Sequence, residues 1–290
     1  MKAEPVRELR PVVRVRGRGA RDEAHVRALA ERLGPGDPDG ADGPDGSSPS
    51  GAADWTLLVD GGRRVLVRPD GVRLEIDFVA GRTGARQHES GLTRQPLARA
   101  LGIPRLGRRL GRAPAIVDAT GGLGRDAWFA ASLGCPVTLV ERSPVVHALL
   151  ESAHARAMAT PATAAVAARV TLLAGDAVAA LPWLDPARPD VVYLDPMYPS
   201  VRRRAAVTKG MQFLHELLGP PDAAEDARLF AAALAAARVQ VTVKRPAGAP
   251  PLTGDETFDG QRSRIESPGT RYDVYIVRGD AELPVNPGSS

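Results

Sequence analysis

The stretch Asp118-Ala-Thr-Gly-Gly-Leu-Gly-Arg-Asp126 lies between a β-like run and a helical run, and it decides the fold. Its glycines, Gly121, Gly122 and Gly124, allow the backbone to turn tightly and to approach a ligand closely. The helix that follows offers free N–H groups at its first turn. Asp118 would repel a pyrophosphate, but it suits the ammonium group of an amino-acid ligand.

From residue 113 onward, strand-like and helical runs alternate. We expect strands at residues 115–117, 137–140, 170–173, 191–194, 239–243 and 272–277. We expect helices at residues 126–133, 145–158 and 223–237, with a helical turn at 178–181. This alternation is typical of an α/β, Rossmann-like fold with a mostly parallel, doubly wound sheet and ligands at the carboxyl ends of its strands. The last run follows a Pro-Gly turn without a helix, which predicts an antiparallel last strand at the sheet edge.

Residues 1–110 have a different pattern and predict a small N-terminal α+β subdomain. Helical spacing over Glu23–Leu33 places Val26, Leu29, Ala30 and Leu33 on one face. Strand-like runs at 55–59, 64–67 and 74–79 predict an antiparallel meander, and a short helix is expected at 96–101. Residues 34–53 are almost all Gly, Pro, Asp, Ser and Ala and are expected to form a flexible insert. We therefore expect domains at 1–110 and 111–280, and a tail at 281–290.

Composition excludes several classes of protein. With 43% hydrophobic and 25% charged residues among 290, the chain is not disordered throughout. It has neither an apolar run of membrane-spanning length nor the apolar core of a signal peptide. The single cysteine, Cys135, excludes a disulfide framework, and the histidines lack metal-ligand spacing. We expect a cytoplasmic protein without a metal. The net charge of +4 weakly favours a polyanionic partner.

Two further strand ends suit an adenosine ligand. Glu141 ends the second strand about 20 residues after Gly121, where a carboxylate can accept hydrogen bonds from both ribose hydroxyls. Ser143 and Pro144 then begin the next helix. Asp176, after the third strand, can accept the adenine amine. A ligand with an adenosine, an amino acid and a sulfonium is S-adenosylmethionine.

The fourth strand ends in Asp195-Pro-Met-Tyr-Pro199, which brings an acceptor, a backbone carbonyl and an aromatic face together. Pro196 keeps its predecessor extended and holds the turn open. The exocyclic amine of a planar base could donate to Asp195 and to the Pro196 carbonyl while the ring stacks on Tyr198. We therefore expect Asp195, Pro196 and Tyr198 to be the catalytic residues.

Basic runs follow this motif and the fifth strand. Expected RNA contacts are Arg202, Arg203, Arg204, Lys209, Lys244 and Arg245. A further run, Arg99, Arg105, Arg108, Arg109 and Arg112, occupies the inter-domain segment. Convergence of these runs on one face would form a track for a phosphate backbone.

With these motifs, the chain resembles the ribosomal RNA small subunit methyltransferase J family. The resemblance rests on Asp118–Asp126, Glu141-Arg-Ser-Pro-Val-Val146, Tyr193-Leu-Asp-Pro-Met-Tyr-Pro199 and Val243-Lys-Arg-Pro246. It covers residues 113 to 277, and the insert at 34–53 departs from it. A second departure is Gly175-Asp176-Ala177, where the family often has small hydroxyl residues.

The resemblance implies a class I methyltransferase that transfers a methyl group from S-adenosylmethionine to the N2 amine of one guanosine in 16S ribosomal RNA. Its partner would be this RNA or the small ribosomal subunit. Residues implied to bind the cofactor are Arg125, Asp126, Glu141, Arg142, Asp176, Ala177 and Asp195. We add Asp118, Gly121 and Gly124 from the glycine turn.

Three alternatives stay open. A methyltransferase could act on another RNA or DNA amine. A nicotinamide-dependent oxidoreductase would use the same glycine turn and Glu141, although Asp118 and the Asp-Pro-Met-Tyr motif disfavour it. A non-catalytic RNA-binding assembly factor could retain the fold as a scaffold.

Overall fold

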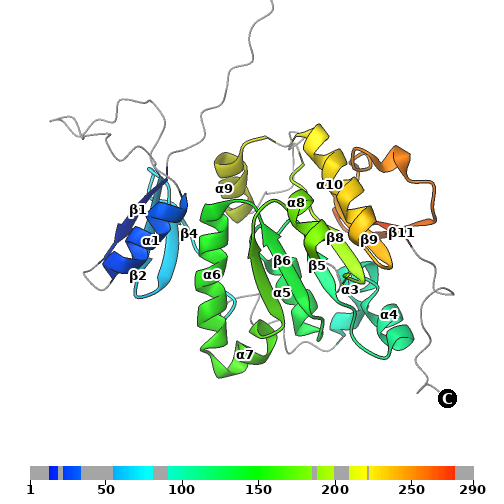
Figure 1. Ribbon diagram of the computed structural model, residues 1–290, viewed down its shortest axis with the longest axis horizontal. Helices are drawn as coiled ribbons and strands as arrows, with labels where there is room; N and C mark the ends of the chain where they lie inside the picture. The colour runs from blue at the N-terminus through cyan, green and yellow to red at the C-terminus, as the bar shows by residue number, and fades with distance from the viewer. Residues whose placement is uncertain are drawn as a thin grey trace, which may run out of the picture.

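A computed structural model describes residues 13–18, 22–33, 55–80, 91–184, 188–198, 209–220 and 222–277. The insert predicted at 34–53 and the tail predicted at 281–290 lie outside these residues. Two sheets organise these described residues, and the smaller, N-terminal one lies beside helix α6 of the larger unit (Figure 1).

The larger sheet has seven strands in the order β10-β11-β9-β8-β5-β6-β7. They are β5 (Ile116–Asp118), β6 (Val137–Glu141), β7 (Val170–Ala174), β8 (Val191–Leu194), β9 (Gln240–Pro246), β10 (Arg262–Ser267) and β11 (Thr270–Ile276). Strands β5 to β9 pair in parallel, whereas β11 is antiparallel to both β9 and β10. The predicted sheet and its antiparallel last strand are confirmed.

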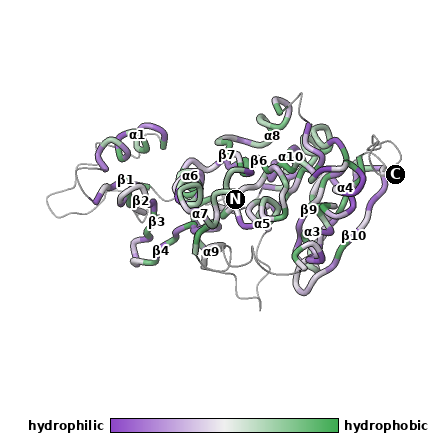
Figure 2. Tube along the Cα trace, turned by 90° about the horizontal axis from the view of Figure 1, so that it is seen from below, coloured by the Kyte–Doolittle hydropathy of each residue, from purple (hydrophilic) through white to green (hydrophobic). Residues whose placement is uncertain are grey.

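The predicted place of that last strand at the sheet edge is wrong, because β10 pairs with its outer side. The sequence gives little sign of β10, since it is polar and mostly exposed, and Ile265 is its one apolar residue. In Figure 2 the tube along β10 is correspondingly hydrophilic over much of its length.

Helices cover both faces of the larger sheet. On one face lie α5 (Arg125–Ser132), α6 (Pro144–Met158), α7 (Pro161–Ala167) and α9 (Lys209–Leu218). On the other lie α8 (Ala177–Ala180), the 3-10 turn η4 (Leu181–Leu184) and α10 (Ala223–Ala236). Alternate strand residues enter the two cores, as Ile116 and Val117 of β5 do. Cys135 is buried in the first core, as predicted.

The N-terminal sheet has the order β1-β2-β3-β4. Its strands are β1 (Val13–Gly17), β2 (Trp55–Asp60), β3 (Arg63–Val67) and β4 (Arg73–Leu74). The antiparallel meander β2-β3-β4 is confirmed, although β4 is shorter than predicted, and β1 adds a parallel strand. Helix α1 (Glu23–Leu33) has the predicted bounds, but Ala30 is exposed and Leu29 is its one buried residue.

Two helices before β5 pack against the larger sheet. They are α3 (Pro96–Ala100), which was predicted, and α4 (Ile103–Leu110), which was not. Gln240 Nε2 and Thr242 Oγ1 of β9 donate to the Ala100 carbonyl at 2.8 and 2.9 Å. The division into two domains stays a proposal, and these contacts favour a boundary before α3 over one at residue 110.

Candidate active site

Four neighbouring strands end in charged residues at one edge of the sheet. Asp118 ends β5 and Glu141 ends β6, while Asp195 follows β8 directly. Lys244 and Arg245 lie near the carboxyl end of β9, which pairs in parallel with β8. The sequence-based expectation that these residues share the carboxyl edge is confirmed.

The glycine turn lies tightly against β6. The Gly121 N–H donates to the Val140 carbonyl at 2.9 Å, and a Cβ atom at Gly121 would lie 2.4 Å from Leu139 Cδ2. Gly124 has a φ of +69°, and a Cβ there would lie 2.9 Å from Phe78 Cζ. The turn therefore requires glycines for packing, in addition to any ligand approach.

Glu141 joins the glycine turn to the start of α6. Its carboxylate accepts from the Gly122 N–H at 2.7 Å and from the Ser143 N–H at 2.7 Å. Burial raises the pKa of Glu141, and these two hydrogen bonds oppose the shift. Ser143 caps α6 by accepting from the Val146 N–H at 3.4 Å, as predicted.

Asp118 is buried and linked through Thr120 to Asp195. Both hydrogen bonds described for the Asp118 carboxylate come from Thr120 and fall on Oδ1. The Thr120 hydroxyl accepts from the Asp195 N–H at 2.7 Å. Burial, and then the charges of Asp126 and Asp195, raise the pKa of Asp118 to about 7. A cation beside Asp118 would relieve this repulsion.

Lys244 lies between two carboxylates. Its ammonium donates to Asp126 Oδ2 and to Asp195 Oδ2, each at 2.8 Å. The Tyr193 hydroxyl donates to the same Asp126 oxygen at 2.6 Å. Partial burial raises the pKa of Asp195, and the Lys244 charge opposes that shift. Sequence analysis predicted that Lys244 contacts phosphate, but in the structure its ammonium has two carboxylate partners inside the site.

Arg245 is more deeply buried than Lys244. Its side chain is 4% exposed, and its guanidinium carbon lies 4.6 Å from the centroid of the Tyr198 ring. Its Nε donates to the Pro250 carbonyl at 3.2 Å. A buried guanidinium under an aromatic ring cannot lie along an exposed phosphate track, so this part of the prediction is corrected.

Other predicted cofactor residues lie around this centre. Asp176 caps α8 by accepting from the Val178 N–H at 2.7 Å, and Ala177 is buried. Arg142 donates to Glu225 of α10 at 2.6 Å. Arg125 is exposed and lines a hollow that also includes Asp77, Phe78 and Leu123.

Part of the predicted RNA surface is not described. Arg202, Arg203 and Arg204 lie outside the described residues, as does the side chain of Lys209, which begins α9. Arg105 and Arg112 of the inter-domain run do not join the site edge. Arg112 pairs with buried Asp190 at 2.6 Å, and Arg105 donates to Gln240 at 2.6 Å, both at the amino ends of strands. Convergence of all the basic runs on one face is therefore wrong.

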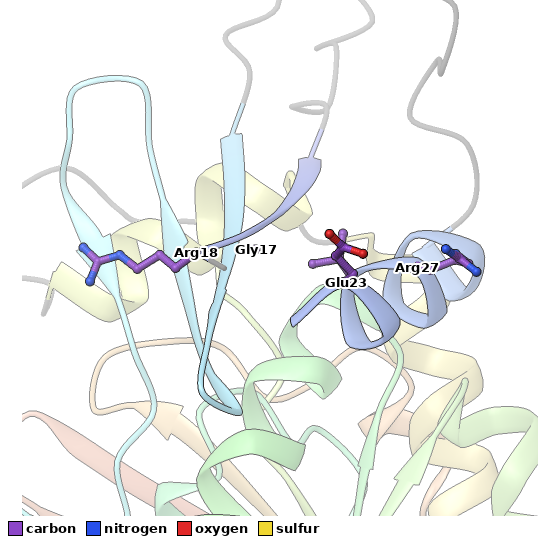
Figure 3. Close-up of a pocket in the computed structure, with 5 residues that line it drawn as sticks. Gly17, Arg18, Glu23 and Arg27 are labelled. Atoms are coloured by element: carbon purple, nitrogen blue, oxygen red, sulfur yellow. The ribbon is translucent and has the colours of Figure 1, made fainter. Parts of the chain in front are cut away.

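A second hollow lies between β1 and α1. In Figure 3 the side chains of Arg18 and Arg27 point away from each other and from Glu23, so no charged groups converge there. Among the described residues no cluster of side chains could hold a metal ion, and no helix is long and apolar enough to cross a membrane.

Comparisons with known proteins agree with this geometry. Residues 63–277 match the model of a family described as "Putative SAM-dependent methyltransferase". The chain is 44% identical to ribosomal RNA small subunit methyltransferase J of Thioalkalivibrio sulfidiphilus, over 76% of this chain and 84% of that protein. It is 43% identical to the protein of the same name from Marinobacter nauticus, over 72% and 71%.

A solved structure is also similar. The crystal structure of a SAM-dependent methyltransferase from Neisseria gonorrhoeae is 29% identical, with a TM-score of 0.58, and covers 80% of this chain and 87% of that one.

Proposed function

Because this chain belongs to the SAM-dependent methyltransferase family that its ribosomal RNA small subunit methyltransferase J relatives represent, we propose that it methylates the N2 amine of a guanosine in 16S ribosomal RNA. The observation that carries the proposal is the position of Asp195, which lies on the same sheet edge as Asp118 and Glu141. The substrate amine and the methyl donor would meet there.

The charges at this edge suit S-adenosylmethionine. Asp126 and Asp195 accept hydrogen bonds from the Lys244 ammonium, and a third carboxylate, that of Asp118, interacts with it electrostatically. A ligand with an amino group and a sulfonium offsets this excess of negative charge, whereas a dinucleotide pyrophosphate would add to it. Membership of a methyltransferase family also contradicts the nicotinamide-dependent alternative.

We assign the cofactor contacts by strand. Asp118 would accept from the amino group and Glu141 from the ribose hydroxyls, using lone pairs that its backbone partners leave free. Asp176 and Ala177 would border the adenine. Gly121, Gly124, Arg125, Asp126 and Arg142 complete the proposed cofactor site. When bound, S-adenosylmethionine supplies an electrophilic methyl group on a sulfonium centre.

Asp195, Pro196 and Tyr198 would position the guanine. The N2 lone pair is delocalised into the ring, so the amine is a poor nucleophile. Hydrogen bonds from the amine to the Asp195 carboxylate and the Pro196 carbonyl would aim that lone pair at the methyl carbon. Alignment of this kind can contribute on the order of 7 kcal/mol. Asp195 keeps 36% of its side chain exposed, so a flipped base can reach it.

The methylated amine must then lose a proton. The Asp195 carboxylate is hydrogen-bonded to Lys244 through Oδ2. Its other oxygen, Oδ1, would accept a hydrogen bond from the amine and could take up the proton.

For the phosphate contacts, our proposal remains Arg202, Arg203, Arg204 and Lys209. We also propose that the substrate is met in the cytoplasm.

Methyl transfer from labelled S-adenosylmethionine tests this function. The assay should use 16S RNA and small ribosomal subunits in parallel, and nucleoside mass mapping should identify N2-methylguanosine. Cofactor binding without transfer to either substrate would favour the non-catalytic assembly factor, and another methylated nucleoside would redirect the substrate assignment.

A further inference from the structure

We propose that Lys244 and Arg245 are positioning residues that hold the two ends of the 195–198 segment, Lys244 through the Asp195 carboxylate and Arg245 through the Tyr198 ring. The inference rests on the proposed function, because it assigns roles to the residues that support its substrate site. It replaces the phosphate contacts that the sequence suggested for this pair.

Strand geometry explains how one dipeptide reaches both ends. Consecutive residues of a strand point to opposite faces of the sheet. Thr242, two residues before Lys244, donates to Ala100 on one side, whereas Val243 packs in the core beneath α10. Lys244 therefore faces α5 and Arg245 faces the α10 side. Strand β8 runs parallel to β9 with Leu194 opposite Val243, so the segment after Leu194 continues beside this pair.

On the α5 face, Lys244 fixes the orientation and charge of Asp195. Its ammonium spans Asp195 Oδ2 and Asp126 Oδ2 at 2.8 Å each, and Tyr193 holds Asp126 in place at 2.6 Å. Charge-assisted hydrogen bonds of this length are the stronger class. With Oδ2 held by Lys244, Oδ1 is the oxygen that remains to accept the guanine amine.

Within the part of the chain that the structure describes, the charged groups that face Asp195 lie on three elements. Lys244 and Arg245 of β9 favour its anionic form, whereas burial and Asp126 of α5 oppose it. Asp118 of β5 also interacts with Asp195 electrostatically. Lys244 is the favourable contact at hydrogen-bond distance, so its removal should raise the pKa of Asp195.

On the other face, Arg245 supports Tyr198. The guanidinium lies 4.6 Å from the ring centroid and is held by the Pro250 carbonyl. Arg245 thereby occupies one face of the ring, and the base would stack on the opposite face. Met197, which lies between Asp195 and Tyr198 in the chain, packs against the hydrophobic core and anchors the middle of the segment.

The Lys244 test compares Lys244→Met with Lys244→Arg, and uses Arg27→Met on exposed Arg27 of α1 as a matched loss of one charge. We expect Lys244→Met to lower kcat on the order of 100-fold, as a displaced catalytic group does, and Lys244→Arg to recover part of it. The acid limb of the pH–rate profile should move to higher pH in Lys244→Met. Its RNA affinity should keep the parental salt dependence.

A phosphate contact would give the opposite pattern. The slope of log affinity against log salt would then fall by about 0.7–0.9 in Lys244→Met, with kcat unchanged. That result would overturn the inference for Lys244, as would an unshifted pH profile in a folded variant.

The Arg245 test is a double-mutant cycle with Tyr198. We expect Arg245→Lys to raise KM for RNA roughly 10-fold with cofactor affinity unchanged, because a lysine ammonium cannot stack flat on the Tyr198 ring as the guanidinium does. Adding Arg245→Lys to Tyr198→Ala should cost nothing further, because the ring through which Arg245 acts is already gone. Lysine retains the charge, so the variant avoids an apolar replacement at a site built for a cation. Additive effects in the cycle would overturn the assignment of Arg245.

The methyl-transfer activity of the parent chain distinguishes a failure of the proposed function from a failure of this inference. Absence of methyl transfer by the parent would overturn the proposed function, and the inference with it. An active parent whose variants match the Arg27→Met control would overturn the inference alone.

Discussion

The carboxylate of Glu141 accepts a hydrogen bond from the backbone N–H of Gly122 at 2.7 Å, so the end of β6 and the glycine turn after β5 form one unit. Its second oxygen accepts from the Ser143 N–H, which extends this unit to the start of α6. A ribose contact at Glu141 would thus rest on a side chain whose orientation is already fixed.

We predict that Glu141→Gln lowers S-adenosylmethionine affinity at least tenfold, because charged hydrogen bonds to the ribose are worth roughly 1.5–3 kcal/mol. Glu141→Ala should lose at least as much affinity. It should also lower the free energy of unfolding, since it leaves two backbone N–H groups without their acceptor at roughly 1–3 kcal/mol each.

Calorimetric titration with S-adenosylmethionine and urea denaturation measure the two effects separately. Unchanged affinity in Glu141→Gln would move the ribose contact to another residue.

Substitutions of Asp195 distinguish a role in positioning the amine from a role in proton transfer. Asparagine keeps the shape and one acceptor oxygen but removes the charge that faces Lys244. If Asp195 mainly aims the amine, Asp195→Asn should retain measurable single-turnover methyl transfer, and Asp195→Ala should lose far more. Equal loss in both variants would indicate that Asp195 must accept the proton. Full activity of Asp195→Ala would refute the active-site assignment.

Most of the larger sheet is predictable because buried parallel strands leave short apolar runs such as 191–194, or β-branched runs such as 239–243, in the sequence. Strand β10 lacks such a run because its side chains are largely exposed. Helix α4 escapes prediction for a related reason. Its sequence includes Gly107 and three arginines, and its apolar face is apparent only once Ile103 and Leu106 are buried in the core.

At the site, too, some residues can be predicted from the sequence and the contacts of others cannot. Asp118, Glu141 and Asp195 are predictable because strand ends of a parallel sheet share one edge. The partners of Lys244 and Arg245 are not, because they depend on the register of β9 against β8 and on where α5 places Asp126. A basic dipeptide alone indicates only positive charge.

Changing Arg202, Arg203 and Arg204 together to Gln should weaken RNA binding and flatten its salt dependence. For each phosphate that an arginine no longer neutralises, the log–log slope should fall by about 0.7–0.9. S-Adenosylmethionine affinity should stay at the parental value. Filter binding across a salt series measures the slope, with Arg27→Gln as a control on exposed Arg27 of α1. A parental slope in the triple variant would show that this run does not bind phosphate.

Asp190 should control stability at the edge opposite the site. It is 1% exposed and accepts from Arg112 at 2.6 Å, from Arg238 Nε at 2.9 Å and from the Ala115 N–H at 2.8 Å. Breaking a buried ion pair costs about 3–5 kcal/mol. We therefore predict that Asp190→Asn lowers the free energy of unfolding by about 3 kcal/mol at pH 7. Asp70→Asn, at an exposed carboxylate, should lower it far less.

The pH dependence gives a second test of Asp190. Burial alone would raise the pKa of Asp190, but Arg112, the Ala115 N–H and Arg238 hold it below the ordinary value. A carboxyl group with a lower pKa in the folded state contributes its stability above the unfolded-state pKa of about 3.9 and loses it as the pH falls through the folded-state value. The difference in unfolding free energy between the parent and Asp190→Asn should therefore shrink below about pH 4. Urea denaturation between pH 7 and pH 3 measures this difference, and a constant difference across that range would contradict the ion-pair account.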